Sequence, residues 1–248
     1  MIITVSNHKG GVGKTALAAH LAFRAAEQWR VLAIDLDVQG NLSTTLLDRN
    51  ARRSATAEQL FGDEQPEPMR TGHPNIDLLP ASRGLIGIDR LKQSAALQAM
   101  AHLRALDRCY HLVVIDTAPA LGLRMTAALA SANQVLVPLV PESYAVDGVA
   151  TVLSEIAAIA EHLNPAMRPA QFVLNLMNPQ ARQHRRIAEQ VAGIVNVASP
   201  WLSRSVAVAD ALAERRPVWR NAGSRKAAAQ WRELCENVLV QADVMPAP

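Results

Sequence analysis

A glycine-rich loop between a short apolar run and a helical run is the feature that most constrains the fold of this chain. The apolar run is Ile2–Val5, the loop Lys9–Thr15 reads KGGVGKT, and the helical run is Ala16–Gln28. Strand, glycine-rich loop and helix in this order are typical of the first unit of a parallel α/β sheet. Against the pattern G-x-x-x-x-G-K-[ST], His8 stands where the first glycine would be, and Lys9 is an added lysine.

The composition of this loop predicts that it binds the phosphates of a nucleotide. Its glycines let backbone N–H groups turn toward phosphate oxygens, and the following helix directs its N-terminus at the same anion. Lys14 is expected to neutralise the β- and γ-phosphates, and the hydroxyl of Thr15 to reach Mg²⁺. The loop residues expected to contact the nucleotide are Lys9, Gly10, Gly11, Val12, Gly13, Lys14, Thr15 and Ala16.

Carboxylates follow two further apolar runs. Val31–Ile34 leads into Asp35 and Asp37, and Leu112–Ile115 leads into Asp116, which is the Walker B pattern. Ligands of α/β sheets bind at the carboxyl ends of the strands, so these acids are expected beside the phosphate loop. We predict that Asp116 joins Thr15 around Mg²⁺. An aspartate at the position of Asp35 or Asp37 can orient the attacking water or hold Mg²⁺ through water.

The rest of the chain continues the alternation of strands and helices. Its 248 residues are half hydrophobic, which is enough to bury the core of one large α/β domain over residues 1–248. We expect a mostly parallel twisted sheet with helices on both faces. The further predicted strands are Ile76–Leu79, Val135–Val140 and Phe172–Leu176; the further predicted helices are Gly84–Asp107, Ala145–His162, Arg182–Gly193 and Ser224–Gln241; and Asp48–Pro74 is predicted to be a loop-rich insertion.

Cysteine usage and hydropathy favour a cytoplasmic protein. Cys109 and Cys235 are two lone cysteines without metal-type spacing, which fits a reducing compartment. The first residues lead directly into a predicted strand, so no signal peptide is expected. No apolar stretch approaches the roughly 20 residues that a membrane span needs.

The small net charge of +3 conceals a basic segment. Between Arg168 and Arg232 there are 11 Lys or Arg and three Asp or Glu, a net charge of +8, while the remainder carries −5. Such an asymmetry indicates a polyanionic partner, although ordinary solvated helix faces also account for it.

Several motifs together resemble the ParA/MinD family of deviant Walker A ATPases. They are the loop Lys9–Thr15, the segment Asp35–Asn41 (DLDVQGN), Ile115–Pro119 (IDTAP), Pro141–Gly148 (PESYAVDG) and Arg204–Pro217, and they extend over nearly the whole chain. The tripeptide QGN within the second segment favours the ParA partition ATPases over the MinD side of the family.

The resemblance implies a mechanism and roles for individual residues. It implies a Mg²⁺-dependent, slow ATPase that dimerises around ATP, binds double-stranded DNA non-specifically and is stimulated by a cargo-bound adaptor, to segregate or position a plasmid, chromosome or protein cargo on the nucleoid. Lys9 resembles the lysine that reaches the partner's phosphates. Asp37 matches the aspartate that positions the hydrolytic water, and Asn175 the asparagine that binds adenine. The resemblance also implies that Asp35 and Asp116 belong to the surroundings of Mg²⁺. The implied catalytic residues are thus Lys9, Lys14 and Asp37.

The chain departs from the family pattern at three positions. Ala16 replaces a usual threonine, Leu212 stands where the late motif has proline, and Ala207 stands where the family often has a DNA-linked arginine. Other arginines of the basic segment are therefore the candidates for DNA contact. They are Arg182, Arg185, Arg186, Arg204, Arg215 and Arg216.

Two other functions remain to be compared with the partition ATPase. A MinD-like membrane-cycling ATPase that regulates cell division or placement would need a basic amphipathic C-terminal helix. The partial apolar stripe from Trp231 onward, however, also carries Glu233, Glu236 and Asp243. A nitrogenase-reductase-like electron carrier would need cysteines after strands that face the nucleotide. Neither Cys109 nor Cys235 has that place in the sequence, so electron transfer is not expected. Membrane association is not expected either, because anionic lipid would repel the acidic residues of the C-terminal helix.

Overall fold

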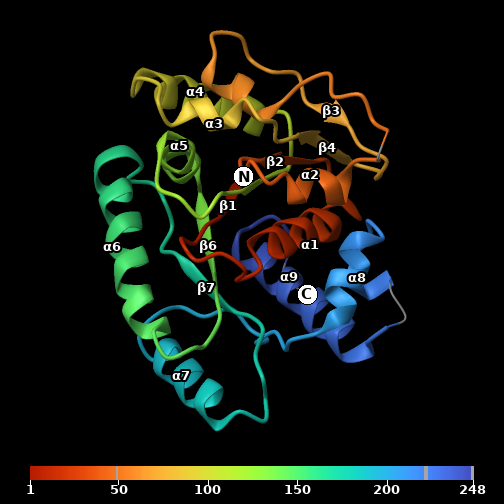
Figure 1. Ribbon diagram of the computed structural model, residues 1–248, viewed down its shortest axis with the longest axis vertical. Helices are drawn as coiled ribbons and strands as arrows, with labels where there is room; N and C mark the ends of the chain where they lie inside the picture. Colours follow the sequence, from red (N-terminus) through yellow and green to blue (C-terminus); the bar gives the residue numbers. More distant parts are fainter. Residues whose placement is uncertain (49, 221–222, 247–248) are drawn as a thin grey trace.

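A seven-stranded sheet passes through the molecule and helices cover both of its faces (Figure 1). The computed structural model describes residues 1–48, 50–220 and 223–246. The strand order is β3-β4-β2-β5-β1-β6-β7, and every pairing is parallel except that of β3 with β4. The strands are β1 Ile2–Val5, β2 Val31–Asp35, β3 Met69–Arg70, β4 Ile76–Leu79, β5 Leu112–Asp116, β6 Gln134–Leu139 and β7 Gln171–Leu174.

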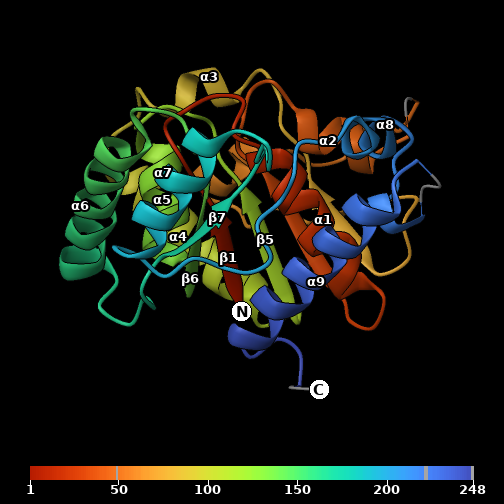
Figure 2. The ribbon, with the colours of Figure 1, turned by 90° about the horizontal axis from the view of Figure 1, so that it is seen from below.

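The helices divide into two layers, which Figure 2 shows on either side of the sheet. One layer contains α1 Lys14–Ala26, α2 Asn41–Leu46, α8 Val206–Ala213 and α9 Arg225–Gln241. The other contains α3 Leu85–Ile88, α4 Ser94–Asp107, α5 Leu123–Ser131, α6 Ala145–Leu163 and α7 Arg182–Ala192. Two 3₁₀ helices, η1 Ala57–Phe61 and η2 Val218–Arg220, complete the described elements.

The continuous apolar character of the strands follows from burial on both faces. In β1, Ile3 and Val5 pack into the layer of α1 and α9, whereas Ile2 packs into the layer of α4 and α5. Successive side chains of a strand point to opposite faces, so a strand between two helical layers is buried on both sides and favours apolar residues throughout. The predicted fold class, a mostly parallel sheet with helices on both faces, is confirmed.

Some predicted elements differ from the observed ones. The single helix expected over Gly84–Asp107 is wrong: α3 and α4 are separate. Asp89, between them, is held by Arg124 of α5, whose guanidinium donates to the Asp89 carboxylate at 2.7 and 3.0 Å. This is a tertiary contact that helical periodicity does not reveal. The insertion Asp48–Pro74 contains η1 and β3 and is otherwise irregular where described.

The last helix, α9, is anchored in the core by its apolar face. Trp231 is 2% exposed and lies against the buried His20 of α1, with ring centroids 4.5 Å apart. The Arg24 guanidinium donates to Glu236 at 2.9 Å beside this contact. The face of α9 that a lipid-binding helix would use is therefore covered by α1. Among the described helices, none combines the length and the apolar character that crossing a membrane requires.

Candidate functional site

The predicted site residues come together at the carboxyl ends of three neighbouring strands. In the sheet register, Asp116 at the end of β5 is paired with Val5 of β1 on one side and with Asp35 of β2 on the other. The glycine-rich loop follows β1 directly. Because β5 lies between β1 and β2, the chain order reverses at this point, which is where open α/β sheets bind ligands.

The glycines give the loop a shape that other residues would not allow. Gly11 and Gly13 have φ angles of 73° and 96°, in the left-handed region. A Cβ on Gly13 would lie 2.2 Å from the side-chain nitrogen of Asn175, so Gly13 is also needed for this close approach. The side-chain oxygen of Asn7 accepts from the backbone N–H of Lys9 at 2.9 Å and fixes the start of the loop.

Lys14 directs its ammonium group into the loop. The side chain is only 7% exposed, and its nitrogen donates to the carbonyl oxygens of Asn7 at 2.9 Å and Lys9 at 3.1 Å. Burial lowers the pKa of Lys14 below its ordinary value, and the nearby charges of Asp116 and Asp37 oppose this change. Lys14 is thus a cation held between the loop carbonyls and the strand-end carboxylates, where phosphate would replace the carbonyls as its partner.

Asp116 and Thr15 form the part of the site that fits a magnesium ion. The hydroxyl of Thr15 donates to one Asp116 oxygen at 2.7 Å, while the other Asp116 oxygen is buried without a hydrogen-bond partner. Burial, followed by the charge of Asp35, raises the pKa of Asp116 well above its usual value. A cation beside the unpartnered oxygen would relieve both costs.

The protein does not supply a complete metal cage at this place. In the part of the chain that the structure describes, no group of three or more His, Cys, Asp and Glu side chains could hold a metal by itself. This agrees with Mg²⁺, which is commonly bound by one or two carboxylates together with substrate phosphates and water.

Asp35 uses its carboxylate within the protein. One oxygen accepts from the Ser43 amide at 2.8 Å and the Ser43 hydroxyl at 2.7 Å, and the other accepts from the Asp37 amide at 3.2 Å. Burial raises the pKa of Asp35 to about 6. Asp35 therefore fixes the turn that carries Asp37 and the start of α2, and its predicted place in the Mg²⁺ surroundings remains a prediction. Sequence reasoning did not single out Ser43.

Asp37 is half-buried and lies just past the end of β2. One of its carboxylate oxygens accepts from the Gln39 amide at 3.0 Å, and its negative charge partly offsets the lowering of the Lys14 pKa by burial. The role of Asp37 with the hydrolytic water remains a prediction.

A hollow of about 180 Å³ adjoins the phosphate loop, and Asn175, the residue predicted to bind adenine, lies in its wall. Its mostly apolar lining includes Ala16 and Leu212, two of the positions that depart from the family pattern. Asn175 donates to the Val12 carbonyl at 2.8 Å and accepts from the Leu176 amide at 2.8 Å, so both ends of its side chain already have partners. The adenine contact of Asn175 stays a prediction.

Lys9 turns its side chain away from the loop. Its ammonium group pairs with Glu142, in the segment between β6 and α6. The sequence offers no signal for this pairing, because Lys9 and Glu142 are 133 positions apart.

The six predicted DNA-binding arginines lie on two separate parts of the molecule. Arg182, Arg185 and Arg186 are exposed on α7, which lies beside α6 in both views, away from α8 (Figures 1 and 2). Arg215, after α8, donates to Asp48 at 3.0 Å, and Arg216 pairs with Glu214.

The remaining predicted contact, Arg204, is exposed just before α8. Within the described residues, neither it nor the three α7 arginines form an ion pair. Ala207 is buried in α8, so an arginine there would need a different local packing.

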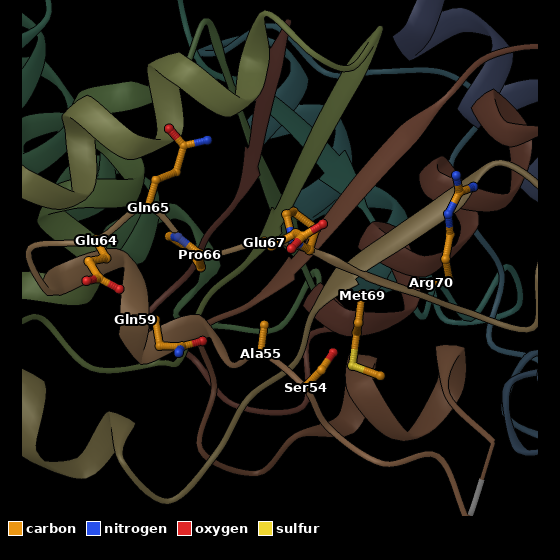
Figure 3. Close-up of a pocket in the computed structure, with 10 residues that line it drawn as sticks. Ser54, Ala55, Gln59, Glu64, Gln65, Pro66, Glu67, Met69 and Arg70 are labelled. Carbon is orange, nitrogen blue, oxygen red and sulfur yellow. The ribbon is translucent and has the colours of Figure 1, made fainter.

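A hollow of about 570 Å³ lies elsewhere, within the insertion (Figure 3). Its lining runs from Ser54 to Arg70 and includes Gln59, Glu64 and Glu67. None of these residues belongs to the phosphate loop or to the ends of β1, β2 and β5. The cations and carboxylates needed for nucleotide chemistry gather at the loop instead.

Comparisons with known proteins agree with this geometry. A family model described as an AAA domain matches residues 1–168. Protein IncC from Escherichia coli is 32% identical, covering 95% of this chain and 68% of its own length. The chromosome-partitioning ATPase Soj from Thermus thermophilus is 30% identical, covering 96% of this chain and 95% of its own length.

Solved structures share the fold. Cobyrinic acid a,c-diamide synthase from Mycobacterium smegmatis, with bound ADP and magnesium, is 27% identical with a TM-score of 0.81 and covers 98% of this chain and 95% of its own. A McdA–ATP complex from Cyanothece has a TM-score of 0.85 at 21% identity, covers 100% and 98%, and supports the fold alone. The ADP and magnesium bound in the Mycobacterium smegmatis structure agree with the predicted ligands. By its phosphate loop, its strand-end acids and its similarity to IncC and Soj over nearly all of its own length, the chain belongs to the ParA/MinD family of deviant Walker A ATPases.

Proposed function

We propose that this protein is a ParA-type ATPase that forms a dimer around ATP, binds DNA without sequence preference and hydrolyses ATP to segregate or position a cargo. The observation that carries the proposal is that the two lysines of the loop, Lys9 and Lys14, point in different directions. Lys14 is buried and serves its own site, whereas Lys9 extends outward from the same loop and is half exposed. An outward lysine at this place is suited to the phosphates of a second protomer.

The residues of the site divide the chemistry among them. Backbone N–H groups of the loop and the Lys14 ammonium group hold the triphosphate, and the apolar hollow at Ala16 takes the base. Thr15 and Asp116 would hold Mg²⁺, which when bound neutralises phosphate charge and orients the γ-phosphate. Asp37 orients the water for in-line attack, and Asp35 keeps Asp37 in place through the 3.2 Å contact to its amide.

Lys9→Ala is expected to keep nucleotide binding but to lose ATP-dependent dimerisation. The variant leaves Lys14 and the loop glycines unchanged, so each protomer retains its own phosphate contacts. It removes the cation proposed to reach the other protomer. Light scattering after size separation, with Mg²⁺ and a non-hydrolysable ATP analogue, measures the mass. Lys92→Ala removes another exposed lysine and serves as the control. If Lys9→Ala protein dimerised like the wild type, the proposed dimer would be wrong.

The polyanion proposed for the basic segment is double-stranded DNA. The exposed arginines of α7 and Arg204 are available to phosphates because no carboxylate of the described chain is paired with them. Arg215 and Arg216 would first have to leave Asp48 and Glu214, and we place them outside the main contact. The proposed setting is the cytoplasm, on nucleoid DNA, with an adaptor protein on the cargo stimulating hydrolysis.

DNA binding is expected to require ATP and to depend steeply on salt. Two protomers in one rigid unit double the phosphate contacts, which raises avidity over that of the monomer. The log of affinity should fall with log salt by about 0.9 per neutralised phosphate. Arg185→Glu with Arg186→Glu should therefore flatten the slope by about two units per protomer bound. Fluorescence anisotropy with two unrelated duplexes, in ATP and in ADP, is the measurement.

The matched control for that variant is Arg83→Glu with Arg90→Glu, the same charge change at exposed arginines around α3. Equal affinity in ATP and ADP, strong preference for one duplex, or an equal loss in the control would each contradict the proposed DNA switch. A MinD-like cycle on membranes is the second candidate. It is disfavoured because the apolar face of α9 is occupied by the contact of Trp231 with α1.

A further inference from the structure

We propose that Glu142 is a positioning residue that holds Lys9 in the free protomer, and that this ion pair must open before Lys9 can serve a second protomer. The inference rests on the proposed dimer. The Lys9 ammonium group pairs with the Glu142 carboxylate, and the two side chains are 55% and 52% exposed. A competing anion can therefore reach Lys9 from solvent, and the contact can exchange without unfolding any element.

The start of the loop is connected to the same part of the molecule by two further contacts. The Asn7 amide donates to the carbonyl oxygen of Pro138 in β6 at 2.8 Å, and the His8 imidazole pairs with Glu155 of α6. Three consecutive residues, Asn7, His8 and Lys9, thus contact the β6–α6 region. The direction in which Lys9 points is set by this region rather than by the glycines of the loop.

Glu142 can release Lys9 without losing all of its compensating charge. Lys9 is the main reason that the pKa of Glu142 lies below its ordinary value, but the positive charge of nearby Arg204 acts in the same direction. Glu142 therefore stays ionised near neutral pH and still has a cation nearby after Lys9 leaves. An exchange of partners is less costly than the exposure of an uncompensated charge.

The pair is also linked to the nucleotide through the backbone of Lys9. Its carbonyl oxygen accepts from the Lys14 ammonium group at 3.1 Å. Phosphates that draw Lys14 toward themselves would weaken this bond and loosen residue 9. Binding of ATP would then favour opening of the Lys9–Glu142 pair in the same protomer. Lys9 would thus be released in the ATP-bound state, which is the state proposed to dimerise.

The expected size of the effect follows from the exposure of the pair. An exposed ion pair changes an equilibrium by up to about fivefold. Two such pairs open when a dimer forms, so their loss should tighten the dimer dissociation constant by up to about 25-fold. A change of this size in the dimer dissociation constant can be measured. It is also small enough that ATP binding can still drive dimerisation of the wild type.

Glu142→Gln is the test, because it keeps the shape of the side chain and removes the charge. Glu161→Gln, at an exposed glutamate of α6 without an ion pair in the described chain, is the matched control. Sedimentation equilibrium with Mg²⁺ and a non-hydrolysable ATP analogue measures the dimer constant. We expect Glu142→Gln to dimerise at a lower protein concentration than wild type and Glu161→Gln to be unchanged.

The sign of the change separates this proposal from its alternatives. A weaker dimer in Glu142→Gln would mean that Glu142 receives the partner's lysine or supports the local fold, and the proposal would be overturned. An unchanged dimer constant would overturn it as well. Improved dimerisation is not what a loss of structural support would produce.

A second measurement tests the contact in the free protomer without relying on the dimer. Reductive methylation followed by mass spectrometry should modify Lys9 more slowly in nucleotide-free wild type than in Glu142→Gln, with Glu161→Gln like wild type. Equal rates would refute the pairing itself. If the rates differ but wild type stays monomeric with the ATP analogue, the proposed function fails at the dimer, and the regulatory role of Glu142 fails with it.

Discussion

Lys14→Ala is expected to abolish ATP binding at the concentrations where the wild type binds. The Lys14 ammonium group is the only side-chain cation that the described part of the loop directs inward, and it is held by two loop carbonyls at 2.9 and 3.1 Å. Removal of an electrostatic clamp on phosphate costs several kcal/mol, which is a loss of at least about 100-fold in affinity. Titration with a fluorescent ATP analogue, with and without Mg²⁺, measures the loss.

Two variants make this result specific to the charge of Lys14. Lys14→Met keeps most of the side-chain volume in a nearly buried place, so it should fold well and yet bind as poorly as Lys14→Ala. Lys92→Ala removes an exposed lysine outside the site and should bind ATP normally. Binding by Lys14→Met within about threefold of wild type would show that the phosphates are held by backbone N–H groups and not by this cation.

The phosphate loop and the strand-end acids could be predicted because their signals are local in sequence. A buried strand needs apolar residues at each position, so Val31–Ile34 and Leu112–Ile115 marked the strands that carry Asp35 and Asp116. The left-handed φ angles of Gly11 and Gly13 likewise correspond to residues that sequence alone identifies.

The partners of these residues could not be predicted, because they come from distant parts of the chain. Nothing in the sequence pairs Lys9 with Glu142, which is 133 positions away, or Arg215 with Asp48, which is 167 positions away. A charge count over the basic segment treats Arg215 like an unpaired arginine. Only the fold shows that its carboxylate partner belongs to the insertion.

A related limit applies to the two aspartates after β2. Alternation along a strand predicts that the side chains of Asp35 and Asp37 point to the same side of the sheet, yet their surroundings differ. Asp35 lies inside the sheet end and accepts three hydrogen bonds, two of them from Ser43 of α2. Helix α2 is six residues long, which is too short for a recognisable apolar period, so the sequence does not reveal its contact with Asp35.

Asp37→Ala is expected to bind ATP and to dimerise, but to hydrolyse ATP at least about 100-fold more slowly than the wild type. The carboxylate of Asp37 is half-buried, and its negative charge acts on Lys14. The interaction proposed for it with the reacting water would be made only as hydrolysis proceeds. Loss of such an interaction lowers turnover while ground-state binding is largely kept. Single-turnover hydrolysis of ATP, at protein concentrations above the dimer constant, separates the chemical step from binding.

Asp37→Asn distinguishes the role in chemistry from a role in structure. The Gln39 amide donates to an Asp37 oxygen at 3.0 Å, and an asparagine oxygen can accept the same bond. If Asp37 only shaped the turn, Asp37→Asn would hydrolyse ATP like the wild type. Because an amide is a far weaker base than a carboxylate and orients water less well, we expect Asp37→Asn to be as slow as Asp37→Ala. Normal single-turnover hydrolysis by either variant would mean that another residue holds the water, and the Asp35–Asp37 turn would then serve only to close the site around the phosphates.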